Sequence, residues 1–139
     1  MESKLGRITD AIDRIKGEGR LVLIGESAGA SLALHAAASD SRVTRVITLC
    51  GVARPDTPVS AHLRRRAPAL NDGVDSLRGV YDMDVHCVRA AVDGVVNKRY
   101  SVVKGAKEHV IWSVGHLPTI SLCLTILAPI ISAIAKKQK

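Results

Sequence analysis

The sequence predicts an α/β protein in three layers, α/β/α, built around a short parallel sheet of about four strands. Two observations support this prediction. Aliphatic runs of strand length recur along the chain, and segments of helical character separate them. Strands joined through helices need right-handed crossovers, which produce a parallel sheet covered on both faces. The length of 139 residues is typical of one domain, so we expect residues 1–139 to form a single domain.

The first half of the chain provides two of the strands. Apolar residues at helical spacing predict an amphipathic helix over residues 4–16. The run LVLIG, residues 21–25, predicts a buried strand, and the alanine-rich stretch 28–38 predicts a helix. Residues 43–51, VTRVITLCG, predict a second buried strand.

Residues 53–84 break this alternation, because three prolines interrupt the segment. Within it we expect one helix over about residues 59–66 and another over about residues 72–79. The segment therefore has the character of an insertion.

The second half of the chain returns to the alternating pattern. Residues 85–92 and 109–115 predict the third and fourth strands, with a helix over 97–107 between them. Residues 117–135 carry no charge and predict a buried closing helix. Attachment to a membrane surface through 117–139 is the alternative, because the lysines at the end would meet anionic headgroups.

The distribution of charge and the low aromatic content bear on whether the protein binds nucleic acid. The net charge is +7, but six positive charges are confined to residues 64–66 and to Lys136, Lys137 and Lys139. With one Trp, two Tyr and no Phe, the chain lacks aromatic residues on which bases could stack, so nucleic-acid binding is disfavoured.

Three cysteines lie inside apolar stretches at spacings unlike a zinc or disulfide pattern: Cys50, Cys87 and Cys123. We interpret them as core thiols in a reducing compartment. Because the sequence opens without an apolar signal segment, we expect a cytoplasmic protein, with peripheral membrane association as the alternative.

The stretch Gly25-Glu26-Ser27-Ala28-Gly29 fits the pattern G-x-S-x-G between a predicted strand and a predicted helix. A sharp turn there would expose the Ser27 hydroxyl and leave the Ala28 backbone amide beside it to bind an oxyanion. A plain glycine-rich turn remains the alternative. A dinucleotide or phosphate loop is disfavoured, because neither glycine motif is present.

A serine nucleophile needs a base and an orienting carboxylate. His116 is the one histidine that follows a predicted strand, and Asp93 directly follows another. The remaining histidines lie in a helix, in the proline-rich segment or at strand beginnings: His35, His62, His86 and His109. A loop histidine and an Asp-Gly turn residue are the structural alternatives for these positions. The order Ser27, Asp93, His116 favours catalysis.

These three segments resemble the α/β-hydrolase superfamily, over nearly the whole chain. GESAGA is similar to the nucleophile elbow of its esterases and lipases, AAVDGVVN to the segment with the acid, and VGHLPT to the histidine loop. The resemblance implies Ser27 as nucleophile, His116 as general acid and base, and Asp93 as orienting carboxylate. It also implies a variable cap over 53–84.

The chain departs from this family before the first strand. Members carry about four further strands there, and a loop among them supplies a second oxyanion amide; only 20 residues precede Leu21 here. If the strands lie in simple order, the strand at 21–25 is an apolar edge. We therefore expect this edge to pair with a second copy or with another polypeptide chain.

The sequence thus favours a small serine hydrolase that cleaves carboxylic esters or thioesters through an acyl-enzyme. This chemistry needs no metal and no organic cofactor. Two alternatives stay open: a weak or inactive hydrolase-like module for binding or assembly, and one part of a split hydrolase.

Overall fold

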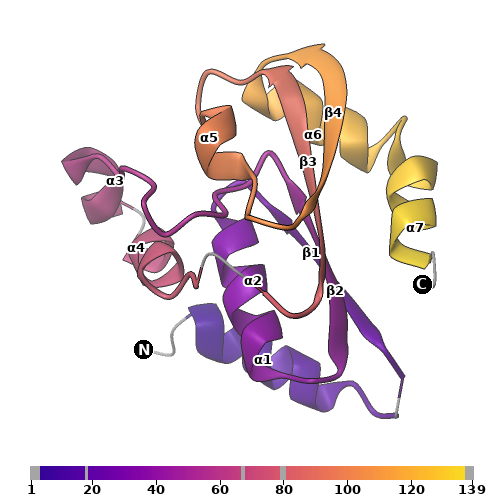
Figure 1. The fold of residues 1–139 in the computed structure, drawn as a ribbon. Helices are drawn as coiled ribbons and strands as arrows, with labels where there is room; N and C mark the ends of the chain where they lie inside the picture. The colour runs from indigo at the N-terminus through magenta and orange to yellow at the C-terminus, as the bar shows by residue number, and fades with distance from the viewer. Residues whose placement is uncertain (1–3, 18, 67, 79–80, 137–139) are drawn as a thin grey trace.

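The computed structural model describes residues 4–17, 19–66, 68–78 and 81–136 and confirms the α/β class. Four parallel strands lie between two layers of helices (Figure 1). The strands pair in the order β1-β2-β3-β4, so β1 and β4 are the two edges. Their bounds are β1 Leu21–Glu26, β2 Val43–Leu49, β3 Asp84–Val92 and β4 Lys107–Val114.

Helices α1 and α2 cover one face of the sheet, and α6 and α7 cover the other (Figure 1). The short helices α3 and α4 come from the proline-rich segment, and α5 lies between β3 and β4. The bounds are α1 Lys4–Arg14, α2 Gly29–Ser39, α3 Ala61–Arg66, α4 Pro68–Asp75, α5 Lys98–Ser101, α6 His116–Leu124 and α7 Ala128–Lys136.

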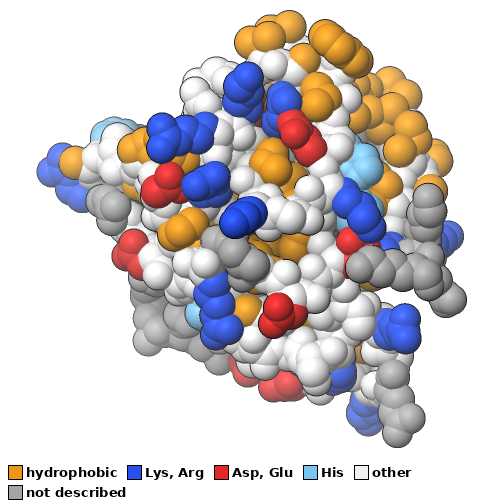
Figure 2. Space-filling model, in the orientation of Figure 1, with side chains coloured by type: hydrophobic (Ala, Val, Ile, Leu, Met, Phe, Trp, Pro, Cys, Tyr) orange, Lys and Arg blue, Asp and Glu red, His pale blue; other side chains and the backbone are white. Residues whose placement is uncertain are grey.

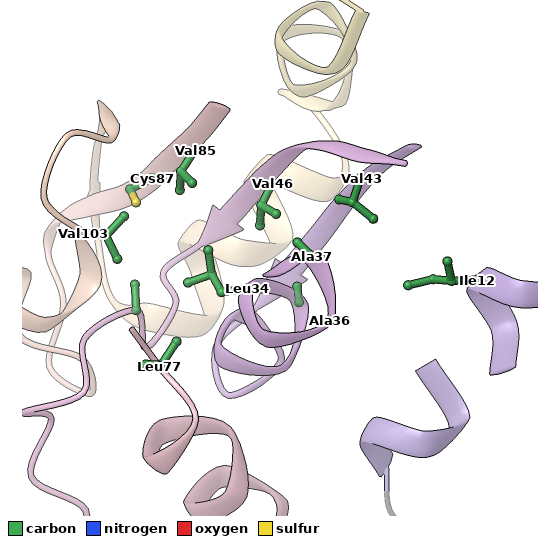
Figure 3. Packing of buried hydrophobic residues seen from close by; sticks show 12 residues of the cluster. Ile12, Leu34, Ala36, Ala37, Val43, Val46, Leu77, Val85, Cys87 and Val103 are labelled. Carbon is green, nitrogen blue, oxygen red and sulfur yellow. The ribbon is translucent and has the colours of Figure 1, made fainter. Parts of the chain in front are cut away.

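The main core lies between the sheet and the helices α1 and α2. Leu34 of α2 is fully buried there, together with Val46 of β2 and Cys87 of β3 (Figure 3). Burying a leucine side chain of this kind contributes about 1.5–3 kcal/mol relative to leaving it exposed. A second cluster, on the other face, joins Ile47 and Leu49 of β2 to the closing helices. Both faces of β2 are therefore buried, as expected for an inner parallel strand.

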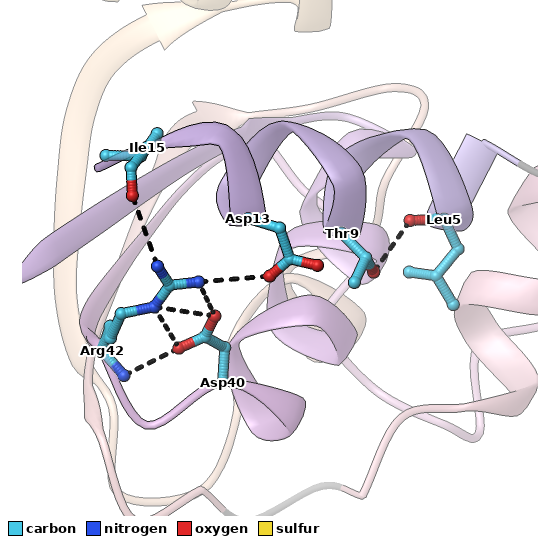
Figure 4. Close-up of polar contacts among 6 residues, drawn as sticks. All are labelled: Leu5, Thr9, Asp13, Ile15, Asp40 and Arg42. Atoms are coloured by element: carbon cyan, nitrogen blue, oxygen red, sulfur yellow. Dashed lines mark hydrogen bonds and ion pairs between the residues drawn. The ribbon is translucent and has the colours of Figure 1, made fainter. Parts of the chain in front are cut away.

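An arginine fastens α1 to the turn between α2 and β2. The Arg42 guanidinium donates to both Asp40 carboxylate oxygens, to Asp13 and to the carbonyl of Ile15 (Figure 4). The Ile15 contact satisfies a carbonyl just past the end of α1. The end of α1 is thus held beside the start of β2, which positions the loop that leads into β1.

Three predicted elements differ from the structure. The helix expected over 97–107 is the four-residue α5, since Gly105 has a φ of +83° and the chain turns there before β4. The helix expected over 72–79 is α4, which starts at Pro68 and ends at Asp75; residue 79 lies outside the described residues. The strand at 21–25 is half-buried on its edge rather than buried, with Ile24 49% exposed.

The closing helix expected over 117–135 is two helices, α6 and α7. Their axes meet at 68°, and several of their apolar side chains are exposed. Over the described residues, neither helix alone has the length and apolarity to cross a membrane; only the bent pair taken together does. Lys137 and Lys139, part of the predicted basic end, lie outside the described residues.

The outer edge strand β4 keeps one face uncovered. Alternate residues point to opposite faces, and Ser113 faces α6, where its hydroxyl lies 2.6 Å from that of Thr119. Val110, Trp112 and Val114 face the other way, and Trp112 is 92% exposed. Hydrophobic side chains also gather at the top of the molecule in Figure 2, where α6 begins. The four-residue α5 is too short to cover this face of β4.

Candidate active site

Ser27 lies in a tight turn between β1 and α2. Its φ of +48° is a left-handed conformation that costs a non-glycine residue energy. Two hydrogen bonds link the turn to β2 and the loop after it: the Ser27 amide donates to the carbonyl of Leu49 (3.0 Å), and the Val52 amide donates to the carbonyl of Ser27 (3.1 Å). The Ala30 amide also donates to the Ser27 carbonyl (3.2 Å). The backbone is therefore fixed by the end of β2 and the loop beyond it.

Of the two glycines that flank Ser27, one is required by space. A Cβ on Gly25 would lie 2.7 Å from the Cα of Ala30 and from the carbonyl oxygen of Gly29, so only glycine lets β1 and α2 approach this closely. A Cβ on Gly29 would meet nothing within 4 Å. Space therefore requires glycine at position 25 but not at position 29, which is the first residue of α2.

His116 begins α6 directly after β4. Gly115, with a φ of +101°, turns the chain between the strand and the helix. The His116 side chain is buried, its Nε2 lies 2.9 Å from the Oγ of Ser27, and its Nδ1 lies 2.8 Å from Oδ2 of Asp93. One imidazole thus contacts a hydroxyl and a carboxylate that come from two other strand ends.

Asp93 follows β3 in a turn that binds its other carboxylate oxygen. The amides of Val95 and Val96 donate to Oδ1 at 2.8 and 3.0 Å, which leaves Oδ2 for His116. Burial by itself would raise the pKa of Asp93, but hydrogen bonds from His116 and the two amides outweigh it and hold the pKa below its usual value. Asp93 is therefore a carboxylate at neutral pH.

Ala28 directly follows Ser27 and has helical backbone angles, with a φ of −62°. Within the described residues its amide donates to no other group of the protein. The amide also lies at the N-terminal end of α2, where the partial positive charge of the helix favours an anion. An oxyanion formed next to Ser27 could accept a hydrogen bond there.

Cys50 is the residue at this site that the sequence did not single out. It follows β2 with a φ of +48°, the same unusual angle as Ser27, and is buried. Its Sγ, a carboxylate oxygen of Asp93 and a ring nitrogen of His116 all lie within 4.8 Å of one another. The sequence hid this position, because the strand was expected to run to residue 51, whereas β2 ends at Leu49 and Cys50 follows it.

These three groups are close enough to be a ligand set for a metal ion, but both ring nitrogens of His116 already contact Asp93 and Ser27. Burial, and then the negative charge of Asp93, raise the pKa of the Cys50 thiol to about 11. Without a bound cation the thiol is therefore protonated at neutral pH. The arrangement fits a buried thiol beside the Asp93 carboxylate.

Two other histidines lie at the opposite ends of the strands. His86 of β3 and His109 of β4 stack with parallel rings, and Nδ1 of His86 lies 2.9 Å from Nε2 of His109. His86 also contacts Asp84, which in turn binds Arg45 and Lys107. This group is remote from Ser27, as expected for residues at strand beginnings.

The comparisons with known proteins agree on the fold. No family profile and no curated protein matches the sequence. Among solved structures, a serine hydrolase involved in carbazole degradation (CarC enzyme) superposes with a TM-score of 0.61 at 12% identity, over 99% of this chain and 73% of that one.

A monoacylglycerol lipase from Paleococcus ferrophilus superposes with a TM-score of 0.61 at 13% identity, over 94% of this chain and 76% of its own. A meta-cleavage product hydrolase from Pseudomonas fluorescens IP01 superposes with a TM-score of 0.57 at 16% identity, over 90% of this chain and 66% of its own. At such low identity these likenesses show the fold alone, and they confirm the fold that the resemblance in the sequence implied. The chain has the α/β-hydrolase fold.

Proposed function

We propose that this protein is a serine hydrolase that cleaves carboxylic esters or thioesters through an acyl-enzyme. One observation carries the proposal: His116 lies within hydrogen-bond distance of both Ser27 and Asp93, with a different ring nitrogen toward each. A nucleophile, a base and an orienting carboxylate in this arrangement are the parts that acyl transfer requires.

The reaction proceeds in two halves. As the Oγ of Ser27 attacks the substrate carbonyl, Nε2 of His116 takes the hydroxyl proton and Asp93 stabilises the resulting imidazolium. His116 then gives that proton to the departing alcohol or thiol, which leaves Ser27 acylated. A water molecule next attacks the acyl group, gives its proton to His116, and releases the acid while His116 returns a proton to Ser27.

The Ala28 amide stabilises the negative oxygen in both halves of the reaction. It is the one oxyanion donor we assign, and removing one donor from such a pair costs about 10²–10³ in rate. We therefore expect slow turnover with good leaving groups, such as aryl esters and thioesters. Amides, whose leaving nitrogen needs stronger protonation, should react more slowly still.

The segment 53–84 would shape the substrate site as a cap, and its packing beside Ser27 supports this part of the proposal. Its side chains Val59, Leu70 and Val74 pack in one apolar cluster with Ala28. Helix α4 lies directly on α2 at Gly73, where an added Cβ would be 2.3 Å from the Oγ of Ser31. Because the cluster reaches the residue after Ser27, substitutions in this segment should change acyl-chain preference.

A fluorophosphonate probe, which reacts with activated serines, tests the proposal. We expect labelling of the wild-type chain and of Ser39→Ala, which removes an exposed serine, but not of Ser27→Ala. With p-nitrophenyl acetate, Asp93→Asn should lower kcat by about 10⁴-fold, because His116 would lose its orienting charge. Absence of labelling in correctly folded wild-type chain would reject hydrolysis in favour of a binding or assembly module.

A further inference from the structure

In the part of the chain that the structure describes, one edge of β1 has no neighbouring strand, and it presents a defined set of backbone groups. In a parallel pair, alternate residues of one strand bond to the neighbour. The amides of Leu21 and Ser27 donate to carbonyls beside β2, so the odd-numbered residues face β2. The N–H and C=O groups of Val22, Ile24 and Glu26 therefore point away from the sheet, where a further strand would bind.

The side chains along this edge are apolar in the middle and oppositely charged at the ends. Alternate residues share one face of a strand, so Val22, Ile24 and Glu26 of β1 lie together, and Arg20 directly precedes the strand in the same alternation. Val22 packs toward the cluster under α7, whereas Ile24 is 49% exposed. Arg20 and Glu26 are both exposed, and within the described residues neither forms an ion pair.

We propose that the β1 edge binds the β1 edge of a second copy of this chain, with the two strands antiparallel and Leu23 opposite its own counterpart. In this register Arg20 faces Glu26 of the partner subunit, and Val22 faces the partner's Ile24. Both charges find opposite charges, and both apolar side chains find apolar ones. Cross-strand pairs of these two kinds stabilise antiparallel sheets.

Other registers satisfy these conditions less well. Outward-facing residues must pair with outward-facing residues, so the register can change only in steps that keep even numbers opposite even numbers. One step in one direction places Glu26 opposite the partner's Val22. One step in the other direction places Arg20 opposite the partner's Ile24. Each leaves a charge against an aliphatic side chain, so charge complementarity selects the proposed register.

The resulting interface is symmetric and closes on itself. Each strand gives the same residues to a two-fold axis at Leu23, as in isologous dimers, and no growing chain of subunits forms through this edge. Two four-stranded sheets become one continuous sheet. The inference does not depend on the proposed hydrolase activity, because it uses the backbone and charges of β1 alone.

Charge reversal at the two ends of the strand tests the proposal. In sedimentation velocity at micromolar concentration, the wild-type chain should have twice the monomer mass. Arg20→Glu should place like charges opposite each other twice per dimer and raise the dissociation constant about tenfold or more, and Glu26→Arg should do the same. The double variant with both changes should restore the dimer. Lys104→Glu, which makes the same charge change on an exposed turn before β4, should leave it intact.

A cross-link tests the register independently of charge. In the proposed dimer a cysteine at position 23 faces its own copy in a non-hydrogen-bonded pair, where the Cα atoms lie about 4.5 Å apart. Mild oxidation of Leu23→Cys should therefore give a covalent dimer. Leu21→Cys, on the same face but opposite the partner's Gly25, should not. Circular dichroism spectra matching the wild type verify folding.

Three outcomes overturn the proposal. The first is a wild-type monomer at micromolar concentration. The second is a dimer that Arg20→Glu leaves unchanged and that Val110→Lys, on the exposed face of β4, dissociates. The third is a double variant, with both Arg20→Glu and Glu26→Arg, that stays monomeric although each single variant folds and has lost dimerisation.

Discussion

The turn at Ser27 makes a sharp prediction about its two glycines. Gly25→Ala and Gly29→Ala add the same methyl group on either side of one serine. At Gly25 the new carbon would lie 2.7 Å from the Cα of Ala30 and 2.9 Å from its amide nitrogen. Carbon atoms in good contact are about 3.5–4.0 Å apart. Because these neighbours are backbone atoms, β1 or α2 must shift to make room.

The magnitudes follow from this geometry. Forcing an extra carbon into a packed interior costs about 1–3 kcal/mol, so Gly25→Ala should lower the free energy of unfolding by that amount. The methyl at Gly29 meets nothing within 4 Å at the first position of α2. Since alanine is a better helix former than glycine, Gly29→Ala should be neutral or stabilising by up to about 1 kcal/mol.

Urea unfolding followed by far-ultraviolet circular dichroism measures the difference. With a typical slope for a small domain, Gly25→Ala should unfold at roughly 1 M lower urea than Gly29→Ala. The Gly25 variant should also lose fluorophosphonate labelling, because its strand and helix must separate at Ser27. Equal midpoints for the two variants would refute the close approach of β1 and α2.

Two further predictions concern the charged group at the opposite ends of the strands. Arg45→Ala should lower the free energy of unfolding by about 1–3 kcal/mol, because the Asp84 carboxylate loses its guanidinium but keeps Lys107 and His86. Arg54→Ala, which breaks an exposed ion pair, should cost less than about 1 kcal/mol. Urea unfolding of both variants measures the two losses of stability. Burial lowers the pKa of His86 below 6.5, so as the pH falls the unfolded chain binds this proton before the folded chain does, and the free energy of unfolding should decrease below pH 6.5. His86→Gln should remove part of this decrease when the free energy of unfolding is measured between pH 7.5 and 5. The same pH dependence in the variant and the wild type would contradict the prediction.

The sequence predicted the parts of the fold that periodicity and strand order determine. Parallel strands put their carboxyl ends on one edge of the sheet, so residues that directly follow strands were expected to meet. Ser27, Asp93 and His116 do meet, at hydrogen-bond distances. Simple strand order likewise left β1 at an edge, as predicted.

Helix lengths were the less predictable part, because single residues ended them. The helix expected after Asn97 stops at Ser101, where Val102 and Val103 are extended or packed in the core and Gly105 turns the chain. The closing helix breaks near Pro129, which has no amide to donate to the carbonyl of Thr125. Periodicity alone cannot weigh such local interruptions against a continuous apolar run.

The role of Cys50 could not be predicted either. A cysteine in an apolar stretch is most simply a core residue, and Cys50 is indeed buried. Its contact with Asp93 and His116 depends on a left-handed backbone angle after β2, which no local pattern indicated. Positions that follow strands therefore merit attention whatever their residue type.

The uncovered face of β4 gives the chain an optical reporter of its own. Trp112, the single tryptophan, is 92% exposed, so its emission should be that of indole in water. Any molecule that binds to this face and covers Trp112 should shift the emission to shorter wavelength, because the indole is then removed from water. A strand that pairs with β1, at the other edge of the sheet, should leave the emission wavelength of Trp112 unchanged. The intrinsic fluorescence of the protein therefore distinguishes binding at β4 from binding at β1.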